Sequence, residues 1–363
     1  MKLRSLVLGL LISAFFLYLA FRNTDWHALG AHLGGARHAY LIPASLLTLF
    51  AFWIRAVRWG QLLAPLQRIG AGTLYSATMI GFMCNNVLPM RLGEFVRAWV
   101  IGRSTRVSPS AAFATIVIER LFDLFAMAGI FGLILLFAPF HNRSFKMGVL
   151  IACLLGGAVL AFLIAYYLMG ERFRRRVEAI LPRPIRARVL GLLRSFQAGL
   201  EIFRDPRRLL LIGILTFAMW FCFAIVIRIC FASAQLETGG ATLPPLASLV
   251  VMVVMAIGIM VPSGPGFVGT LQAAAVLGLA IVGYHDRNKA LSFSILYHFT
   301  QWFPVVLVGL IYLIRENLSL AQVGRLAGEE PLASGEEVPR ATAPAAPEAE
   351  SGTEREGEPL DRN

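Results

Sequence analysis

Residues 73–94 read TLYSATMIGFMCNNVLPMRLGE, and this stretch decides the fold of the chain. It begins as an apolar run of about 17 residues, fewer than the roughly 20 that cross a bilayer as one helix. The run breaks at Pro89, with Asn85 and Asn86 just before the break and Gly93 just after it. Proline lacks a backbone N–H and glycine tolerates unusual backbone angles, so together they end a helix and allow a tight turn. We therefore predict a helical hairpin, residues 73–103.

A second apolar stretch, residues 244–262, breaks in the same manner at PSGPGF. In both breaks a proline is followed four residues later by a glycine, which is Gly93 in the first and Gly266 in the second. A short apolar helix, a loop and a long helix come next, the long helices being expected at 110–138 and 290–314. Paired interrupted segments in two halves of a chain are typical of inverted-repeat transporters and point to the substrate site. The alternative is that proline and glycine only kink two ordinary packed helices.

The composition is that of a membrane protein. Hydrophobic residues make up 57% of the 363 residues and charged residues 15%, and the mean hydropathy is +0.70. This is more apolar surface than one soluble core could bury. The net charge of +12 does not indicate a nucleic-acid partner, because the arginines lie at the ends of hydrophobic segments, in the positive-inside pattern. We predict an all-α, polytopic membrane protein with an inverted repeat.

Hydropathy and charge together predict six full spans and two re-entrant hairpins. The spans are expected at residues 3–22, 39–63, 110–138, 146–169, 209–235 and 290–314, and the hairpins at 73–103 and 244–287. One side of the membrane collects Lys2, Arg4, Arg55, Arg58, Arg68, Arg103, Arg106 and the basic segment 171–208. We assign that side, and both termini, to the cytoplasm. The first hairpin is then expected to open to the cytoplasm and the second to the outside.

The predicted transmembrane domain covers residues 1–320. Within it, residues 171–208 hold 11 arginines against 4 acidic residues and keep apolar residues at helical spacing. We interpret them as an amphipathic helix on the cytoplasmic face and as a place where a cytoplasmic protein could dock. The alternative is a plain basic linker. Residues 328–363, rich in Ala, Pro and Glu, are predicted to form a disordered acidic tail.

Several ionisable residues fall at membrane depth, where a charge facing lipid costs a few kcal/mol. They are Arg91, Glu94, Arg97, Glu119, Arg120, Asp123, Arg228 and His298. Glu119 and Asp123 are one helical turn apart and share a face. Two carboxylates there need a cation or a proton, which Arg91, Arg97 or Arg120 could supply.

A phosphate suits this region, because a broken helix presents free N–H groups and the positive end of its dipole to any cavity beside it. In a functional interpretation, Arg91 and Arg120 hold a lipid phosphate, and Glu94, Glu119 and Asp123 release it. In a structural interpretation, the same residues are an ion-pair cluster that holds the hairpin in place. The candidate substrate-binding residues are Asn85, Asn86, Arg91, Glu94, Arg97, Glu119, Arg120, Asp123, Ser263, Gly266, Tyr297 and His298.

The sequence has no motif of a hydrolase, a zinc protease or a nucleotide-binding loop. Ser263 to Gly266 are rich in glycine but lack the lysine and the preceding strand of a phosphate loop. The four cysteines lie in apolar stretches without disulfide or zinc-site spacing. We expect no enzymatic activity, no metal and no cofactor.

Three stretches carry a resemblance to a known family: NNVLPMRLGEFVRA at 85–98, IERLFD at 118–123 and VPSGPGFVGT at 261–270. They resemble the signatures of the lysylphosphatidylglycerol synthase transmembrane-region family, over about residues 1–320. The family includes the flippase half of bacterial lysyl-lipid synthases and stand-alone proteins linked to moving hopanoids or other lipids. The resemblance implies a lipid-translocating membrane domain. The chain departs from the two-domain members by lacking the aminoacyl-transferase domain, so synthase activity is not carried over.

We therefore expect a bacterial inner-membrane lipid flippase or transporter for a phospholipid, a hopanoid or a polyisoprenoid-linked lipid. The headgroup would lie between the hairpins while the acyl chains stay in the bilayer, and transport would be passive, ion-coupled or dependent on a partner. One alternative is a lipid-binding accessory subunit of a lipid or glycan synthesis complex. Another is a membrane enzyme that uses Glu119 and Asp123 on a lipid-linked substrate. An oligomer is compatible with each of these.

Overall fold

The computed structural model of the protein describes residues 3–88, 92–137, 205–238, 241–261, 263–320 and 322, with single positions between 154 and 190. Pro89 to Arg91, Pro262, the expected span at 146–169, most of the basic segment 171–208 and the tail 328–363 lie outside the described residues. Within the described part almost all regular structure is α-helical, which confirms the predicted all-α class.

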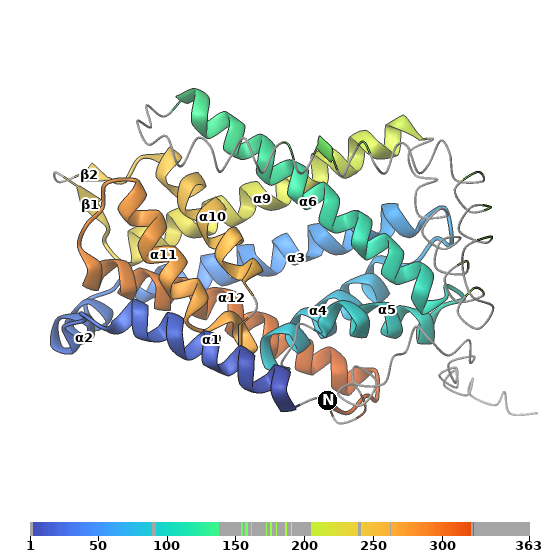
Figure 1. Ribbon diagram of the computed structural model, residues 1–363, viewed down its shortest axis with the longest axis horizontal. Helices are drawn as coiled ribbons and strands as arrows, with labels where there is room; N and C mark the ends of the chain where they lie inside the picture. Colours follow the sequence, from blue (N-terminus) through green and yellow to red (C-terminus); the bar gives the residue numbers. More distant parts are fainter. Residues whose placement is uncertain are drawn as a thin grey trace, which may run out of the picture.

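The described elements follow the chain from blue to red in Figure 1. The first half contains α1 (Leu3–Phe21), α2 (Trp26–Gly34), the 3-10 helix η1 (His38–Tyr40), α3 (Leu41–Leu63), α4 (Ala71–Val87), α5 (Gly93–Ser104) and α6 (Pro109–Phe137). The second half contains α9 (Pro206–Ser233), β1 (Glu237–Thr238), β2 (Ala241–Thr242), α10 (Pro245–Met260), the 3-10 helix η4 (Pro265–Phe267), α11 (Thr270–Ile281) and α12 (Arg287–Arg315).

Side chains at the helix ends explain several of these boundaries. Asp25 and Asp205 each accept hydrogen bonds from two backbone N–H groups in the first turns of α2 and α9. Pro206 begins α9, where a missing N–H costs nothing. Asp286 caps α12 in a similar way. The short helix α2 and the antiparallel pair β1–β2 were not predicted, although Asp25 ahead of an apolar run is a usual helix-start signal.

Three described helices are long and apolar enough to cross a membrane, namely His38–Leu63, Pro206–Ser233 and Arg287–Arg315. Helix α6 has 29 residues, about 43 Å of helix, but it carries three charged residues. The arms of the two predicted hairpins are shorter, with 17 and 12 residues in α4 and α5 and 16 and 12 in α10 and α11. The chain is a multi-pass membrane protein that combines full-length helices with half-length ones.

The half-length helices form two hairpins at opposite ends of the molecule, and the inner ends of their helices lie near its centre (Figure 1). In the first hairpin, a Cβ on Gly93 of α5 would collide with the carbonyl oxygen of Gly81 of α4. In the second, a Cβ on Gly258 of α10 would collide with the side chain of Ala274 of α11. Small residues thus let the two arms of each hairpin pack backbone to backbone.

Each hairpin lies against a long helix from the other half of the chain. Helix α12 packs along α4 as well as α11, and α10 contacts α6 as well as α9. Helices α3 and α9, which precede the two hairpins, pack along each other. The contact of α12 with α4 is close, since a Cβ on Gly309 would collide with the side chain of Met83. The two halves are therefore interleaved.

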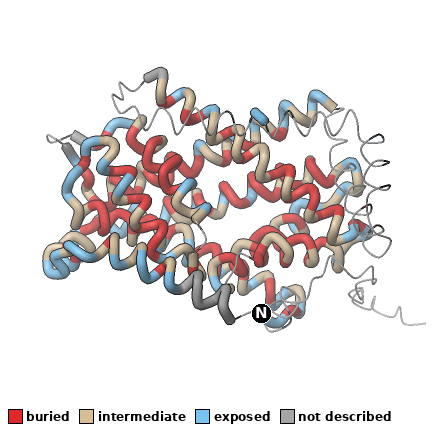
Figure 2. Tube along the Cα trace, in the orientation of Figure 1, coloured by how far each residue is buried: buried red, intermediate tan, exposed pale blue. Residues whose placement is uncertain are grey.

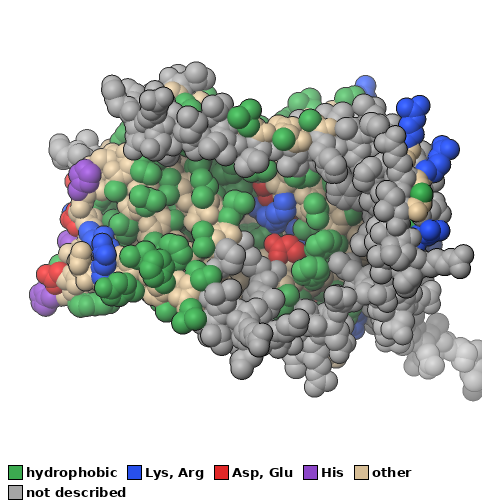
Figure 3. All heavy atoms as spheres, viewed as in Figure 1, with side chains coloured by type: hydrophobic (Ala, Val, Ile, Leu, Met, Phe, Trp, Pro, Cys, Tyr) green, Lys and Arg blue, Asp and Glu red, His purple; other side chains and the backbone are tan. Residues whose placement is uncertain are grey.

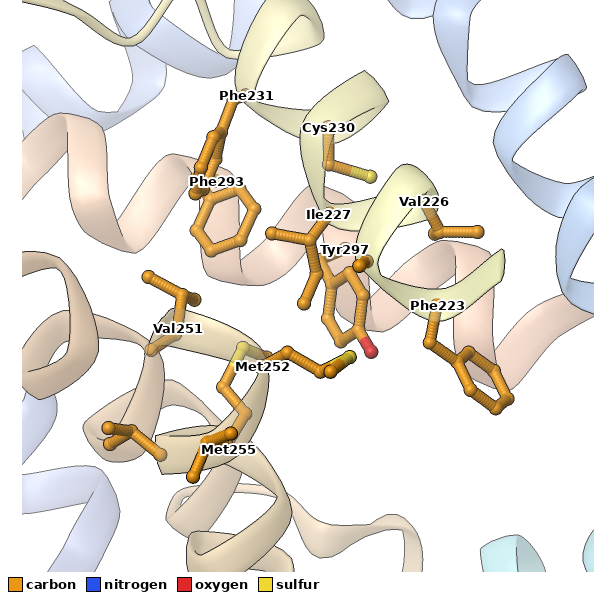
Figure 4. Packing of buried hydrophobic residues seen from close by; sticks show 14 of the residues in the cluster. Phe223, Val226, Ile227, Cys230, Phe231, Val251, Met252, Met255, Phe293 and Tyr297 are labelled. Carbon is orange, nitrogen blue, oxygen red and sulfur yellow. The ribbon is translucent and has the colours of Figure 1, made fainter. Parts of the chain in front are cut away.

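The buried core follows this arrangement. Buried residues lie mostly on the parts of the helices that face the interior, and exposed residues lie mostly on the outside (Figure 2). A large apolar cluster joins α9, α10 and α12, where Phe223, Ile227, Met252 and Phe293 pack around Tyr297 (Figure 4). A second cluster joins α3, α4, α5 and α6. The outer faces are also apolar, as expected for surfaces that meet lipid.

Candidate functional site

Asn85, at the end of α4, holds the turn of the first hairpin. Its Oδ1 accepts the backbone N–H of Gly93 at 2.8 Å, and its Nδ2 donates to Glu94 Oε2 at 3.3 Å. Asn85 therefore fixes the first turn of α5 from the facing arm. Arg91, a predicted site residue between the two arms, lies outside the described residues.

A buried ion-pair cluster lies beside this hairpin. Its members come from α3, α5 and α6 and are four arginines and two carboxylates: Arg55, Arg58, Arg97, Arg120, Glu119 and Asp123. We refer to it as the arginine–carboxylate cluster. It contains four of the predicted site residues, and Glu94 is not among its ion pairs.

Glu119 pairs with arginines from all three helices. Its Oε1 lies 2.9 Å from Arg55 Nη1 and 3.1 Å from Arg58 Nη2, and its Oε2 lies 2.9 Å from Arg97 Nη2. Asp123, one turn further along α6, lies 2.6 Å from Arg58 Nη1 and 3.2 Å from Arg55 Nη1. Arg55 and Arg58 therefore bridge the two carboxylates, which share a face of α6.

The placement of Arg55 and Arg58 corrects the prediction that they mark the cytoplasmic surface. Helix α3 continues past them to Leu63, and the two residues are only 4% and 0% exposed. Their charges pair with α6 instead of contacting water or headgroups. A signal for this was present in the sequence, because the two arginines are three residues apart, share one helix face and are followed by Trp59, Leu62 and Leu63.

Aromatic and hydroxyl groups surround the guanidinium groups of the cluster. The Arg97 guanidinium carbon lies 3.8 Å from the centre of the Trp59 ring, and that of Arg55 lies 5.0 Å from the centre of the Phe82 ring. Arg58 Nη1 donates to Thr216 Oγ1 of α9 at 3.0 Å. The ring faces supply favourable cation–π contact where water is excluded.

The cluster carries two more positive than negative charges, four guanidiniums against two carboxylates. Within the described part, the Nε atoms of Arg55, Arg58, Arg97 and Arg120 are buried without a hydrogen-bond partner. Arg97 Nη2 is at ion-pair distance from Glu119 Oε2 but lacks the angle of a hydrogen bond. An unpaired buried donor costs about 1–3 kcal/mol. The charge and the free donors together suit an anion.

Arg120 is the accessible member of the cluster. Its side chain is 39% exposed, whereas the side chains of the other members are 8% exposed or less. Figure 3 shows a hollow in the middle of this face of the molecule, with basic and acidic side chains on its floor and apolar side chains around it. The hollow opens on the side of the molecule, away from the two ends of its long axis.

The described residues at the turn of the second hairpin form a polar network without charged side chains. Ser263 Oγ lies 3.3 Å from Thr270 Oγ1, and the backbone N–H of Gly264 donates to Ser13 Oγ of α1 at 2.7 Å. His298 of α12 lies beside this turn, with its Nδ1 2.9 Å from Nε2 of Gln272. Ser13 and Gln272 were not predicted, because neither forms a recognisable motif in the sequence.

The two turns meet at Gly266. Trp302 of α12 donates from Nε1 to the carbonyl oxygen of Asn86 at 3.4 Å. A Cβ on Gly266, where φ is 68°, would lie 3.3 Å from that same oxygen and 3.2 Å from Trp302 Nε1. The structure thus brings Asn86, Gly266 and His298 to one region. Trp302, the residue between the turns, was missed from the sequence.

Tyr297 and Arg228 lie elsewhere. Tyr297 is buried among apolar side chains in the core (Figure 4), 6.0 Å from Phe293 between ring centres. Arg228 donates to Thr242 Oγ1 at 3.0 Å and to the carbonyl oxygen of Leu243, at the start of the link to α10. In the described part, no group of three or more His, Cys, Asp or Glu side chains could hold a metal ion.

Known proteins are similar to this chain over much of its length. A family model described as "Lysylphosphatidylglycerol synthase TM region" matches residues 6–309, which confirms the resemblance of the three signature stretches. A UPF0104 membrane protein of Methanothermobacter thermautotrophicus is 26% identical over 276 residues, covering 70% of this chain and 78% of its own length. A UPF0104 membrane protein of Methanocaldococcus jannaschii is 27% identical over 245 residues, covering 64% and 95%.

A relative with a named activity covers less of the chain. Glycosyltransferase AglD of Haloferax volcanii is 32% identical over 132 residues. These residues are 36% of this chain and 21% of the length of that relative.

Proposed function

This chain belongs to the lysylphosphatidylglycerol synthase TM region family, and from that premise we propose that it moves a lipid between the two leaflets of a membrane. The headgroup, bearing a phosphate, occupies the region between the arginine–carboxylate cluster and the meeting point of the two hairpins. The acyl chains stay in the bilayer. One observation carries the proposal: two interrupted hairpins from opposite ends meet beside a buried cluster with excess positive charge.

The hairpins support a route through the middle of the protein. Non-helical backbone at membrane depth is tolerated only against protein or a wet cavity. Here the two turns lie against each other through Asn86, Gly266 and Trp302. If each hairpin enters and leaves the membrane on one side, this contact lies near the midplane. Separation of the turns on one side at a time would give alternating access.

The cluster supports a phosphate as the bound group. Its two unbalanced positive charges favour an anion, and guanidiniums bind phosphate through paired N–H donors. Arg120, the exposed member, is the arginine of the cluster that an entering headgroup would meet first. Glu119 and Asp123 compete for the same guanidiniums and so keep the hold on the phosphate weak enough for release.

The proposal includes an orientation. We place the protein in the cytoplasmic membrane of a bacterium with both termini in the cytoplasm, the first hairpin opening inward and the second outward. The positive-inside rule supports this through Lys2, Arg4, Arg68, Arg103 and Arg106, which remain on one side after Arg55 and Arg58 are removed from the count. The named relatives are archaeal proteins. Cysteine labelling from each side of intact cells would test the orientation.

Reconstitution tests the activity directly. Purified protein is placed in liposomes containing a fluorescent phosphatidylglycerol, and a membrane-impermeant quencher reports the lipid in the outer leaflet. We expect protein-dependent loss of the protected half of the signal. Mass spectrometry of the same lipid should show no chemical change, because we propose a transporter and not an enzyme. A changed lipid mass would favour an enzyme.

A matched pair of variants tests the role of the cluster. Arg120→Ala should lower translocation about tenfold or more, the effect of losing a charge-assisted contact. Arg103→Ala removes an arginine that lies over the Trp99 ring in the last turn of α5, outside the cluster, and should leave translocation unchanged. Size-exclusion chromatography checks that both variants are folded. If Arg120→Ala folds and transports normally, the cluster is only a structural ion-pair network.

A second candidate function is an accessory role in making lipid-linked glycans. The observation that favours it is the similarity of 132 residues to a relative named a glycosyltransferase. In this role the chain binds the lipid and a separate enzyme acts on it. Liposomes with the purified protein alone would then show no translocation, and a co-purifying partner would restore activity.

A further inference from the structure

The amide of Gln272, in the first turn of α11, is held at both of its ends. Its Oε1 accepts the backbone N–H of Gly269 at 2.8 Å, and its Nε2 lies 2.9 Å from His298 Nδ1 on α12. A backbone N–H can only donate, so the oxygen of the amide must face Gly269 and the amino group must face His298. An amino group also only donates. Nδ1 of His298 is therefore the nitrogen without a proton.

The second nitrogen of the ring is fixed by the same reasoning. The His298 ring also lies near the backbone of Gly266. Because Nδ1 accepts from Gln272, Nε2 carries the proton of the neutral ring. The neutral ring therefore fits its hydrogen bond with Gln272.

A protonated ring does not fit this network. The imidazolium carries a second N–H, at Nδ1, which would point at the amino group of Gln272. Flipping the Gln272 amide would not remove the conflict between two donors, because its amino group would then face the N–H of Gly269. Protonation of His298 therefore breaks the hydrogen bond that links α12 to the start of α11.

That hydrogen bond holds the turn at which the two hairpins meet. Gly266 and Gly269 both have positive φ, 68° and 93°. Gly269 packs against the backbone of α1 so closely that a Cβ would collide with it. Gly266 packs against the carbonyl oxygen of Asn86 and the Trp302 indole. A change at His298 is therefore passed directly to the contact between the hairpins.

We propose that His298 is a proton-binding site that controls the turn of the second hairpin. Uptake of one proton from water forms an N–H bond at Nδ1, places one positive charge on the ring and breaks the hydrogen bond from Gln272 Nε2. The start of α11 is then released from α12. His298 is partly exposed, so it is not sealed inside the protein. This inference rests on the proposed function, and it couples lipid movement to the uptake of a proton.

Among the described residues, no other titratable group forms a hydrogen bond or an ion pair with this ring. Helix α11 and η4 contain none. The neighbouring elements α2, α3, α4 and α9 and the rest of α12 contribute His27, His32, Arg55, Arg58, Tyr75, Cys84, Arg207, Arg208, Cys222, Arg228, Cys230, Arg287, Lys289, Tyr297, Tyr312 and Arg315. Across the described residues, none of these has a hydrogen bond or ion pair with His298. Arg55 and Arg58 are paired with Glu119 and Asp123.

Trp302 provides a direct readout, because its indole contacts Gly266. In purified protein, lowering the pH from about 8 to below the usual range of histidine should shift the Trp302 emission reversibly. Quenching by acrylamide should also become easier. The loss of one hydrogen bond predicts about a tenfold rise in the population of the released state. Trp302→Phe identifies the signal among the other tryptophans.

Two variants decide whether His298 is responsible. His298→Asn supplies an oxygen that accepts from Gln272 but does not titrate, so the emission should become independent of pH. Gln272→Glu supplies a carboxylate that accepts from both Gly269 and a protonated ring, so the link should persist at acidic pH. His285→Asn, which changes an exposed histidine in the loop before α12, should keep the full response. A pH response that survives in folded His298→Asn would overturn the proposal.

Transport measurements separate this inference from the proposed function. Translocation by the parent protein should rise about tenfold across the same pH range, whereas His298→Asn should be slow at every pH. If Trp302 responds to pH but no lipid moves at any pH, the proton site stands and the transport function fails. If lipid moves and neither Trp302 nor the rate responds to pH, the transport function stands and the proton site fails.

Discussion

At the scale of single residues, Glu119 is the centre of the arginine–carboxylate cluster. One fully buried carboxylate lies within 3.6 Å of a guanidinium nitrogen of each of four arginines. Burying one ion costs several kcal/mol, so each charge in this set depends on the others for its stability. Removing a positive charge brings the cluster closer to neutral, and removing a negative one leaves it further from neutral. The carboxylates are therefore the more sensitive members.

Glu119→Gln should test this asymmetry. The side chain keeps its shape but the cluster then has three unbalanced positive charges, and the free energy of unfolding should fall by about 3–5 kcal/mol. Thermal unfolding in detergent measures the loss. Adding Arg97→Gln returns the excess to two, so the double variant should recover part of the stability. A single variant as stable as the parent would show that the cluster is hydrated and not held by its ion pairs.

Residue chemistry was only partly predictable from sequence. Glu119 and Asp123 were expected to share a face and to need arginines, and Arg97 and Arg120 were among the candidates. Arg55 and Arg58 were assigned to the membrane surface, because an arginine near a helix end satisfies the positive-inside rule whether or not it is buried. The spacing of the two arginines shows only that they share a face of α3, and which helix meets that face is a property of tertiary packing.

At the scale of elements, the hairpins depend on close contact between their arms. Gly93 lies against the backbone of Gly81 and beside the Asn85 amide, so no side chain fits between α4 and α5 at this height. Gly258 and Ala274 make the corresponding contact between α10 and α11. In lipid the hydrophobic effect does not drive helices together, so such close packing is a main source of their association.

Gly93→Ala should therefore open the first hairpin. The new Cβ meets the backbone carbonyl oxygen of Gly81 and the Asn85 amide, which is held in place by its hydrogen bonds to Gly93 and Glu94. We expect a loss of about 1–3 kcal/mol in unfolding free energy, as for overpacking, and reduced lipid translocation. Gly213→Ala, within α9, is the control, because nothing lies within 4 Å of its Cβ. It should be neutral or stabilise the protein by up to about 1 kcal/mol. Equal unfolding temperatures for both variants would contradict a tight hairpin.

The positions of most elements followed from hydropathy and from proline and glycine. The breaks after α4 and α10 were recognised because an apolar run of about 17 residues is too short for a span and too long for a turn. The start of α9 was predicted three residues late, since Asp205 and Pro206 begin the helix among arginines that resembled a loop. The helix α2 was missed because its nine residues show no apolar periodicity of useful length.

At the scale of the whole molecule, the two halves share an arrangement but differ in chemistry. The first hairpin lies beside six charged side chains, whereas the polar side chains described around the turn of the second carry hydroxyl, amide, imidazole and indole groups. The proposed headgroup would thus be held by charge nearer the first hairpin. The uncharged turn would move past it at little electrostatic cost. The contact between Asn86, Gly266 and Trp302 joins these two parts and is where they must separate.

Fixing that contact should stop transport without unfolding the protein. In a variant whose native cysteines are replaced, Asn86→Cys and Trp302→Cys place one thiol on each side of the contact, which the structure closes through the Trp302 indole. A short, reducible bifunctional thiol reagent should join them, and translocation should fall at least about tenfold because the turns can no longer part. Reduction should restore it. Each single-cysteine variant treated in the same way is the control and should keep its activity. Undiminished translocation by the cross-linked protein would mean that lipid crosses by a route that does not pass between the two hairpins.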